Sequence, residues 1–174
     1  MAVLLDWVSI SEEALLPHFR EIRCLPFERA RVFDLVAGVE RYPSFLRWCP
    51  ASRVRPLDAL GRAFVADVLV RGRLVHERLT ARVVLDPCRD IRIEHVAGPF
   101  RHMISHWRFR DAEGGGCVVD VEIDFELRSV WLDRLVGLFF DEAVRRLVDA
   151  FAARARAVDE TAPASRPERL PQPA

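Results

Sequence analysis

The sequence predicts an α+β domain in which a curved antiparallel sheet wraps around a long C-terminal helix. Two patterns indicate this: apolar and polar residues alternate through most of residues 52–127, and apolar residues recur three and four positions apart over residues 131–158. The helix would span about 42 Å and each of the last two strands about 40 Å, so the lengths match. A long sheet with one dry face needs a cover, and this helix provides it in a helix-grip arrangement.

Composition sets the domain organisation. The chain has 174 residues, of which 51% are hydrophobic, enough for one domain with a sizeable core. We expect a folded domain over residues 18–158, preceded by an extension over residues 1–17. A disordered, proline-rich tail is expected over residues 159–174.

Charge and hydropathy limit the partners. The formal net charge is zero, so no overall positive field favours nucleic acid and no DNA partner is expected. Contact with a ribosome or a membrane would require a local patch. No window approaches the roughly 20 apolar residues of a membrane span, and no signal peptide is expected. We therefore expect a cytoplasmic protein whose contact with the membrane, if any, is peripheral.

The elements before the meander are a strand, a helix and a turn. We expect the strand at Phe19–Cys24, the helix at Phe27–Val36 with Pro26 at its first turn, and the turn at Tyr42–Leu46. Six further strands are expected at Ser52–Leu57, Arg62–Val70, Leu74–Leu85, Asp90–Val96, Arg101–Arg110 and Gly116–Leu127. Their loops are too short for a crossover helix, so consecutive strands should pair antiparallel.

The last hairpin allows a prediction of register. If the loop over residues 111–115 places Arg110 opposite Gly116, apolar side chains pair on one face and histidines meet carboxylates on the other. The expected pairs are Trp107–Val119, Met103–Ile123, His106–Asp120 and His102–Asp124.

Motifs for catalysis or metal binding are missing from the sequence. It contains no phosphate-binding glycine loop and no nucleophile elbow, and Gly114–Gly116 is interpreted as a hairpin loop. The four cysteines are scattered, without a C-x-x-C pair. His102 and His106 would lie about 13 Å apart on a strand, too far to share a metal ion. We therefore expect no catalytic residue, no metal and no cofactor, and the sequence leaves the oligomeric state open.

Three segments carry a family resemblance. The run Phe33–Cys49 resembles the signature of the coenzyme Q-binding START-like family, which includes the bacterial RatA proteins. Gly98–Phe100 with His106–Phe109 resembles the second block of that family, and Leu132–Phe151 resembles the third. The resemblance extends over about residues 18–158. Arg47 departs from the pattern, because the family usually has proline there.

The resemblance implies a function and leaves two alternatives. It implies a hydrophobic cavity between sheet and helix that holds ubiquinone or a similar isoprenoid lipid, in a carrier that supports respiratory electron transport without catalysis. The first alternative is a toxin that binds the large ribosomal subunit and blocks subunit association. The second is a polyketide cyclase or aromatase, which would need several convergent polar groups in the cavity.

Candidate site residues follow from the strand and helix phases. An isoprenoid tail needs apolar walls, since each buried CH₂ is worth about 0.8 kcal/mol. The residues expected to line the cavity are Phe45, Trp48, Phe64, Val68, Leu79, Val83, Met103, Trp107, Val121, Ile123, Phe125, Phe139, Val144 and Leu147. Each of them also fits an ordinary core position, so the hypothesis concerns the set.

Two polar residues and one turn complete the candidates. Glu77 and His95 fall on the apolar phase of their strands, where they either hydrogen-bond a quinone oxygen or reach water at a strand end. The turn residues Tyr42, Pro43, Leu46 and Arg47 are candidates for a cavity mouth or a membrane-contacting lip. The alternative for this segment is a short helix docked on the edge of the sheet.

Overall fold

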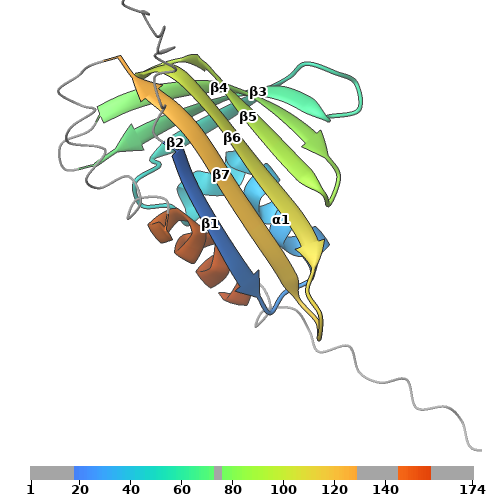
Figure 1. The fold of residues 1–174 in the computed structure, drawn as a ribbon. Coiled ribbons are helices and arrows are strands. Elements are labelled where there is room, and N and C mark those ends of the chain that lie inside the picture. Colours follow the sequence, from blue (N-terminus) through green and yellow to red (C-terminus); the bar gives the residue numbers. More distant parts are fainter. Residues whose placement is uncertain (1–17, 73–75, 129–144, 158–174) are drawn as a thin grey trace, which may run out of the picture.

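The computed structural model of the chain describes residues 18–72, 76–128 and 145–157. Its strands are β1 His18–Leu25, β2 Ala51–Pro56, β3 Ala63–Arg71, β4 His76–Asp86, β5 Asp90–Ala97, β6 Phe100–Asp111 and β7 Cys117–Leu127. They form one antiparallel sheet of seven strands in the order β1-β7-β6-β5-β4-β3-β2 (Figure 1). The predicted meander from β2 to β7 is therefore confirmed, and β1 adds to its far edge beside the last strand.

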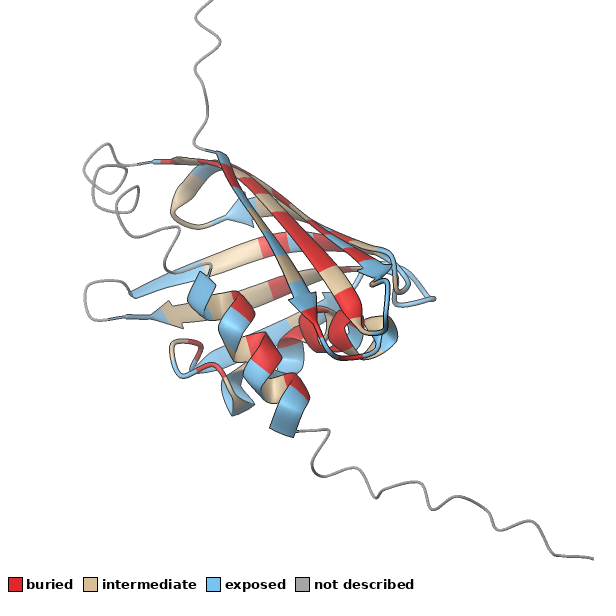
Figure 2. Ribbon diagram, turned by 60° about the horizontal axis from the view of Figure 1, so that its bottom comes forward, coloured by how far each residue is buried: buried red, intermediate tan, exposed pale blue. Residues whose placement is uncertain are grey.

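The helices within the described ranges lie on one side of the curved sheet. The chain between β1 and β2 forms the α-helix α1 (Arg29–Ala37) and the 3₁₀ helix η1 (Val39–Ser44). A helix over residues 145–157, called here the C-terminal helix, lies beside them on the same concave face (Figures 1 and 2). The α+β fold class is confirmed, with a curved antiparallel sheet and a C-terminal helix against it.

The alternation of residues along each strand separates a dry face from a wet one. On β7 every second side chain, from Cys117 to Leu127, is buried against the helices, as the sequence predicts. One cluster of buried side chains extends from β1 to the C-terminal helix, and part of it lies where α1 meets the sheet. There Phe33 of α1 packs edge to face against Phe109 of β6, with ring centroids 5.4 Å apart. Burying each such side chain contributes about 1.5–3 kcal/mol.

The predicted register of the last hairpin is wrong by one position in each strand. Asp111 pairs with Cys117, so Trp107 faces Val121 and the loop runs from Ala112 to Gly116. The pairs that replace the expected ones are Phe109–Val119, Met103–Phe125, His106–Glu122 and His102–Glu126. Gly116 belongs to the turn because its φ is +90°, a left-handed value that a strand does not use. The register differs from the prediction by one residue in each strand, two in total, so every side chain keeps its predicted face.

The start of the first helix also differs from the prediction. Helix α1 begins at Arg29, after Glu28, which has an extended ψ of 137° and whose carbonyl accepts the first helical hydrogen bond, from Val32. Pro26 and Phe27 form a bend before the helix. The expected strand Leu74–Leu85 is described from His76 onward, and the expected extension and tail lie outside the described residues.

Two irregularities in the sheet lie on either side of the β5–β6 turn. Between β4 and β5 the pairing shifts at Thr80 and Ala81, and between β6 and β7 it shifts between Phe100 and His102. The second shift leaves Arg101 as an extra residue, so that Phe100 pairs with Leu127 and falls on the concave face. A strict period of two counted through Arg101 would place Phe100 on the opposite face.

Candidate functional site

The C-terminal helix is fixed to the concave face by one aromatic side chain. Phe151 lies edge to face against Trp107 of β6, and also against Tyr42 and Phe45 at η1, with ring centroids 5.4–5.9 Å apart. The Tyr42 hydroxyl donates a hydrogen bond to the carbonyl of Val36. Burial raises the pKa of Tyr42, so the hydroxyl keeps its proton. The helix, η1 and the middle of the sheet therefore form one packed unit.

Charged groups hold the same helix to the edge strand β1. Arg23 donates to Glu21 at 2.6 Å and lies 3.5 Å from Asp149 of the helix. Arg145 of the helix lies 3.7 Å from Glu21. Exposed pairs of this kind each contribute little to stability. They lie beside β1, while the apolar side of the helix, with Val148, Phe151 and Ala155, is buried in the core.

A row of side chains crosses the sheet at the end away from α1. It consists of Val68, Leu79, His95, Phe100 and Phe125, and it is called here the distal strip. Val68 of β3 pairs with Leu79 of β4. The His95 ring lies 5.9 Å from the Phe100 ring, which in turn lies 6.1 Å from Phe125. Val68 and Leu79 thus join β3 to β4, and the three rings join β5, β6 and β7; the imidazole is the polar group among these five side chains.

The distal strip is less deeply buried than the α1 end of the same face. Phe125 is buried, whereas the other four members are half-buried. At the α1 end, Val83 and Ile91 are at most 2% exposed. The concave face therefore has a closed half that packs on α1 and a partly open half at the distal strip (Figure 2).

The imidazole of His95 contains a buried nitrogen, Nε2, that lacks a hydrogen-bond partner among the described residues. Burial lowers the pKa of His95, and the charges of Arg128 and His102 act in the same direction, while a hydrogen bond with the Ala97 backbone opposes them. The imidazole is therefore neutral at pH 7. A neutral ring nitrogen can donate or accept one hydrogen bond, according to its tautomer.

Ser105 is a second polar group of the concave face, and it was not among the polar candidates although its strand phase places it there. It is 3% exposed, and its Oγ accepts a hydrogen bond from the Trp107 indole at 3.0 Å. It pairs with Ile93 of β5 and Ile123 of β7, on the concave face. Its place between apolar residues on the dry phase of β6 was the available signal. Phe100 was missed because the bulge at Arg101 is not visible in the pattern.

The structure brings most of the expected lining residues onto one face. Phe64, Val68, Leu79, Val83, Met103, Trp107, Val121, Ile123 and Phe125 all belong to the core or pack on it, together with Phe45, Trp48 and Leu147. Phe139 and Val144 lie outside the described residues. Glu77 is exposed at the start of β4, while His95 reaches into the core, so the two polar candidates separate.

The turn expected to form a mouth or lip is the helix η1 and the residues after it. Leu46 is 1% exposed, so it belongs to the core and not to a lip. Pro43 and Arg47 are exposed, and Tyr42 is held by its hydrogen bond and by Phe151. The described part of this segment fits the alternative of a short helix docked on the sheet.

Two open hollows lie away from the distal strip. One of about 390 Å³ lies between α1, η1 and strands β2 and β3, and Phe64 is the expected lining residue that borders it. The other, of about 410 Å³, lies between the start of α1 and the β6–β7 loop. Neither is the cavity expected between sheet and long helix, whose residues 131–144 lie outside the described part of the chain.

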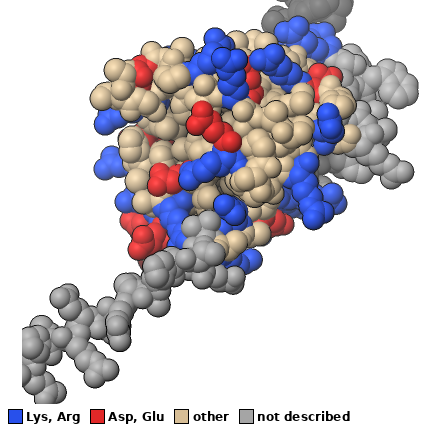
Figure 3. Space-filling model, turned by 180° about the vertical axis from the view of Figure 1, so that it is seen from behind, with Lys and Arg blue, Asp and Glu red and all other residues tan. Residues whose placement is uncertain are grey.

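The described residues contain no group of His, Cys, Asp and Glu side chains arranged to hold a metal ion. Within the same ranges, no helix has the length and hydropathy needed to cross a bilayer. On the surface seen from behind, charged side chains of both signs are interspersed with broad uncharged areas (Figure 3).

Comparison with known proteins identifies the family. Residues 25–152 match the family model described as polyketide cyclase / dehydrase and lipid transport. The ribosome association toxin RatA of Pseudomonas aeruginosa is 32% identical over 139 residues, which cover 80% of this chain and 95% of that protein. The mitochondrial coenzyme Q-binding protein COQ10 homolog B of Xenopus laevis is 30% identical over 141 residues, 79% of this chain and 57% of that protein.

Solved structures agree with the fold. A START superfamily protein from Mycobacterium smegmatis superposes with a TM-score of 0.73 at 13% identity, covering 81% of this chain and 98% of that one. At that identity the likeness concerns the fold alone. The chain therefore belongs to the polyketide cyclase / dehydrase and lipid transport family and has the helix-grip fold of START-like proteins.

Proposed function

We propose that this protein binds an isoprenoid quinone such as ubiquinone, or a lipid of similar shape, against the distal strip. In this role it is a non-catalytic carrier that supports respiratory electron transport and contacts the inner face of the cytoplasmic membrane peripherally. The observation that carries the proposal is the buried Nε2 of His95, which has no partner among the described residues although it lies beside Phe100.

The energetics of the strip favour a ligand with a long apolar part and one polar end. An unpaired buried polar atom costs about 1–3 kcal/mol, which a ligand oxygen that hydrogen-bonds His95 would recover. Each CH₂ of a tail that leaves water contributes about 0.8 kcal/mol. Most of the affinity would come from the tail, and the His95 contact would orient the ring. The coenzyme Q-binding protein among the relatives supports this assignment.

Lipid extraction tests the proposal directly. The full chain, purified from cells rich in ubiquinone, should release ubiquinone on extraction, as detected by mass spectrometry. The variant His95→Phe keeps a ring of similar size without the nitrogen and should retain several-fold less. His76→Phe, on an exposed residue of β4, is the matched control and should retain as much as the parent. An empty extract from the parent protein contradicts quinone binding.

A second candidate function is association with the large ribosomal subunit. The observation that favours it is the 32% identity with RatA over 95% of that protein. If the chain acts in this way, inducing its expression should raise the free subunits at the expense of joined ribosomes in sucrose gradients. A gradient unchanged by induction removes this candidate and leaves quinone binding untouched.

Catalysis is not proposed. A cyclase would need several convergent polar groups, and among the described residues the concave face offers His95 and Ser105 within its apolar area. The Ser105 Oγ already accepts a hydrogen bond from the Trp107 indole N–H.

A further inference from the structure

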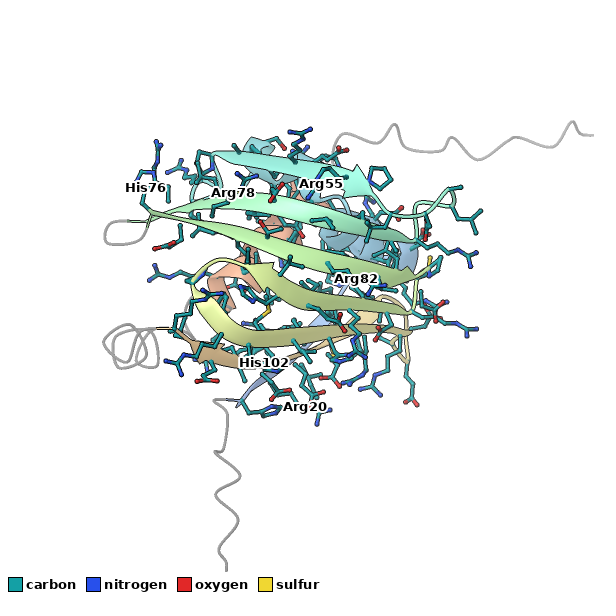
Figure 4. All side chains as sticks on the ribbon, turned by 90° about the horizontal axis from the view of Figure 1, so that it is seen from above. Arg20, Arg55, His76, Arg78, Arg82 and His102 are labelled. Atoms are coloured by element: carbon teal, nitrogen blue, oxygen red, sulfur yellow. The ribbon has the colours of Figure 1, made fainter. Side chains whose placement is uncertain are left out.

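The convex face of the sheet, opposite the distal strip, carries a concentration of arginines on three strands. It consists of Arg53, Arg55, Arg71, Arg78 and Arg82 and is called here the basic patch. All five are exposed and stand on β2, β3 and β4. Figure 4 looks onto this face, with Arg55, Arg78 and Arg82 on one half and Arg20 and His102 on the other.

On the other half of the face, acidic and basic groups compensate each other. Arg20 binds Asp120 at 2.7 Å and Arg108 binds Glu122 at 2.7 Å. Farther along the same strands, Arg101 lies 3.4 Å from Glu126. Strands β6, β7 and β1 therefore present paired charges, although the whole chain is formally neutral.

The basic patch lacks such compensation. The carboxylate of Asp67, at its centre, accepts a hydrogen bond from the Thr80 hydroxyl at 2.6 Å and lies 3.1 Å from Arg78. Those contacts lower the pKa of Asp67, with a smaller effect from the charge of Arg55. Arg53, Arg55 and Arg82 form no salt bridge with any of the described residues. Glu94 of β5, the cross-strand neighbour of Arg82, is engaged by Arg92 at 2.8 Å. The two carboxylates beside the patch thus already have partners.

The spacing of these arginines suits a row of phosphates. Arg55 and Arg82 share a cross-strand row through Val65, so their backbones lie about 9.6 Å apart. Arg78 and Arg82 lie four residues apart on β4, which is about 13.6 Å. A surface of this size can neutralise several phosphates of one backbone, and the release of counterions would favour binding.

The neighbouring side chains favour double-helical RNA over the other polyanions. No Phe, Tyr or Trp stands on the convex side of β2, β3 and β4 within their described bounds, so unpaired bases would find no stacking platform. Docking to a membrane usually adds large apolar anchors to the charges. The apolar side chains among these arginines are the half-buried Val65 and Leu69, and the exposed one beside Arg82 is a valine, Val84. A duplex needs only its phosphates to be neutralised.

We infer that the basic patch binds the phosphate backbone of double-helical RNA. Which RNA is bound rests on the ribosome-binding function proposed above. If that function holds, the partner is a helix of ribosomal RNA. It does not depend on quinone binding, because the patch and the distal strip lie on opposite faces of the sheet. All 26 basic residues of the chain are arginine, so finding arginine in the patch is not itself evidence for phosphate binding. The inference rests on where the charges lie.

The test compares two triple variants of the full chain. Arg53→Gln, Arg55→Gln and Arg82→Gln together remove the three patch arginines without salt bridges. Arg101→Gln, Arg108→Gln and Arg110→Gln remove the same charge from the compensated half. Binding to a labelled RNA hairpin of about 20 base pairs is followed by fluorescence anisotropy between about 50 and about 200 mM salt.

The parent protein should bind the hairpin with an affinity that falls steeply with salt. The patch variant should bind at least about tenfold more weakly, and the slope of log affinity against log salt should decrease by about 0.9 for each phosphate that the variant no longer neutralises. The control variant should stay within about twofold of the parent. Circular dichroism and thermal unfolding verify that both variants fold.

Three outcomes overturn the inference: the parent fails to bind the hairpin, both variants weaken equally, or only binding to vesicles containing anionic phosphatidylglycerol depends on the patch. The last outcome would assign the patch to a membrane. The sucrose-gradient experiment is separate from this test. A hairpin bound through the patch, with subunit joining unchanged, would remove ribosome association but keep the RNA-binding surface.

Discussion

Phe151 of the C-terminal helix meets Trp107 of β6 at an interplanar angle of 86°, with ring centroids 5.9 Å apart. The same ring also contacts Tyr42 and Phe45, so one side chain joins the helix, η1 and the sheet. The lipid site proposed above needs the helix in place, because the helix and the distal strip share the concave face. The position of Phe151 therefore links the stability of the helix to the proposed lipid site.

Replacing Phe151 by alanine should lower the free energy of unfolding by about 3–5 kcal/mol, since it leaves a cavity among three aromatic rings. Urea unfolding followed by circular dichroism measures the change. Arg156→Ala, on the exposed side of the same helix, is the control and should have little effect. Equal stability of the two variants would show that the aromatic contact does not hold the helix.

Gly116 should tolerate substitution less well than its neighbour Gly115. Both have left-handed φ values, so alanine at either position introduces backbone strain of about 1–3 kcal/mol. A Cβ on Gly116 would also clash with the Leu25 carbonyl oxygen, whereas one on Gly115 would meet nothing within 4 Å. Thermal unfolding of Gly116→Ala and Gly115→Ala compares the two. A Gly115 variant that is the less stable one would refute the close approach of β1 to this turn.

The ion pair between β1 and β7 should support stability at neutral pH and lose that role in acid. Arg20 donates two hydrogen bonds to Asp120, which lower the pKa of that carboxyl below its ordinary value of 3.8, and the charges of Arg20, Arg108 and Arg110 act in the same direction. The folded state thus holds the Asp120 proton less tightly than the unfolded chain. Stability from this group is present above that ordinary value and is lost as pH falls through the folded value.

Asp120→Asn should therefore lower the melting temperature by a few degrees at neutral pH and by less in strong acid. Melting curves from about pH 7 to about pH 3 measure this difference. Glu113→Gln, on an exposed loop residue, should melt like the parent throughout. A deficit of Asp120→Asn that stays constant with pH would show that the ion pair is not the cause.

The fold could be predicted largely from the sequence because period and length are local signals. The alternation from Cys117 to Leu127 identified the dry face of β7, and the loops between strands were too short for any topology other than a meander. The register of the last hairpin was wrong because it depends on which glycine begins the strand. Three consecutive glycines give no sequence signal for that choice, which the left-handed φ of Gly116 decides.

The candidate site was predictable to a smaller extent. The phase of each strand placed Val68, Leu79 and Phe125 correctly on the concave face. Glu77 and His95 both fall on the apolar phase of their strands, so strand phase could not distinguish them. Glu77 is exposed at the start of β4, whereas the Nε2 of His95 is buried, because the two residues lie at different positions along the sheet. Phe100 was missed because a bulge changes the phase, and a bulge is a property of strand pairing.

The basic patch needed the structure for a similar reason. Its arginines come from three strands and are separated in the sequence by apolar and acidic residues. The sequence therefore has no run of basic residues that would predict the patch. The prediction from net charge was that ribosome or membrane contact would require a local patch. Register places Arg55 and Arg82 in one row and gathers the acidic residues of β7 elsewhere.

His95 should make stability depend on pH in the opposite sense to a histidine that gains an acidic partner. Its pKa in the folded protein lies below the ordinary 6.5, mainly because burial disfavours the charged ring. As pH falls below that ordinary value, the unfolded chain takes up a proton that the folded protein does not, and stability decreases. The decrease continues until pH reaches the folded pKa.

Replacing His95 by phenylalanine should remove this loss, because the variant has no proton to bind. The His95→Phe protein should be at least as stable as the parent at about pH 8, since an unpaired buried nitrogen disappears, and its advantage should grow toward about pH 5. Urea unfolding at both pH values measures the difference, with His76→Phe, an exposed histidine variant that leaves His95 in place, as the control. Parallel pH profiles for the parent and the His95 variant would mean that Nε2 already has a partner in the folded protein, and the main support for a ligand at His95 would disappear.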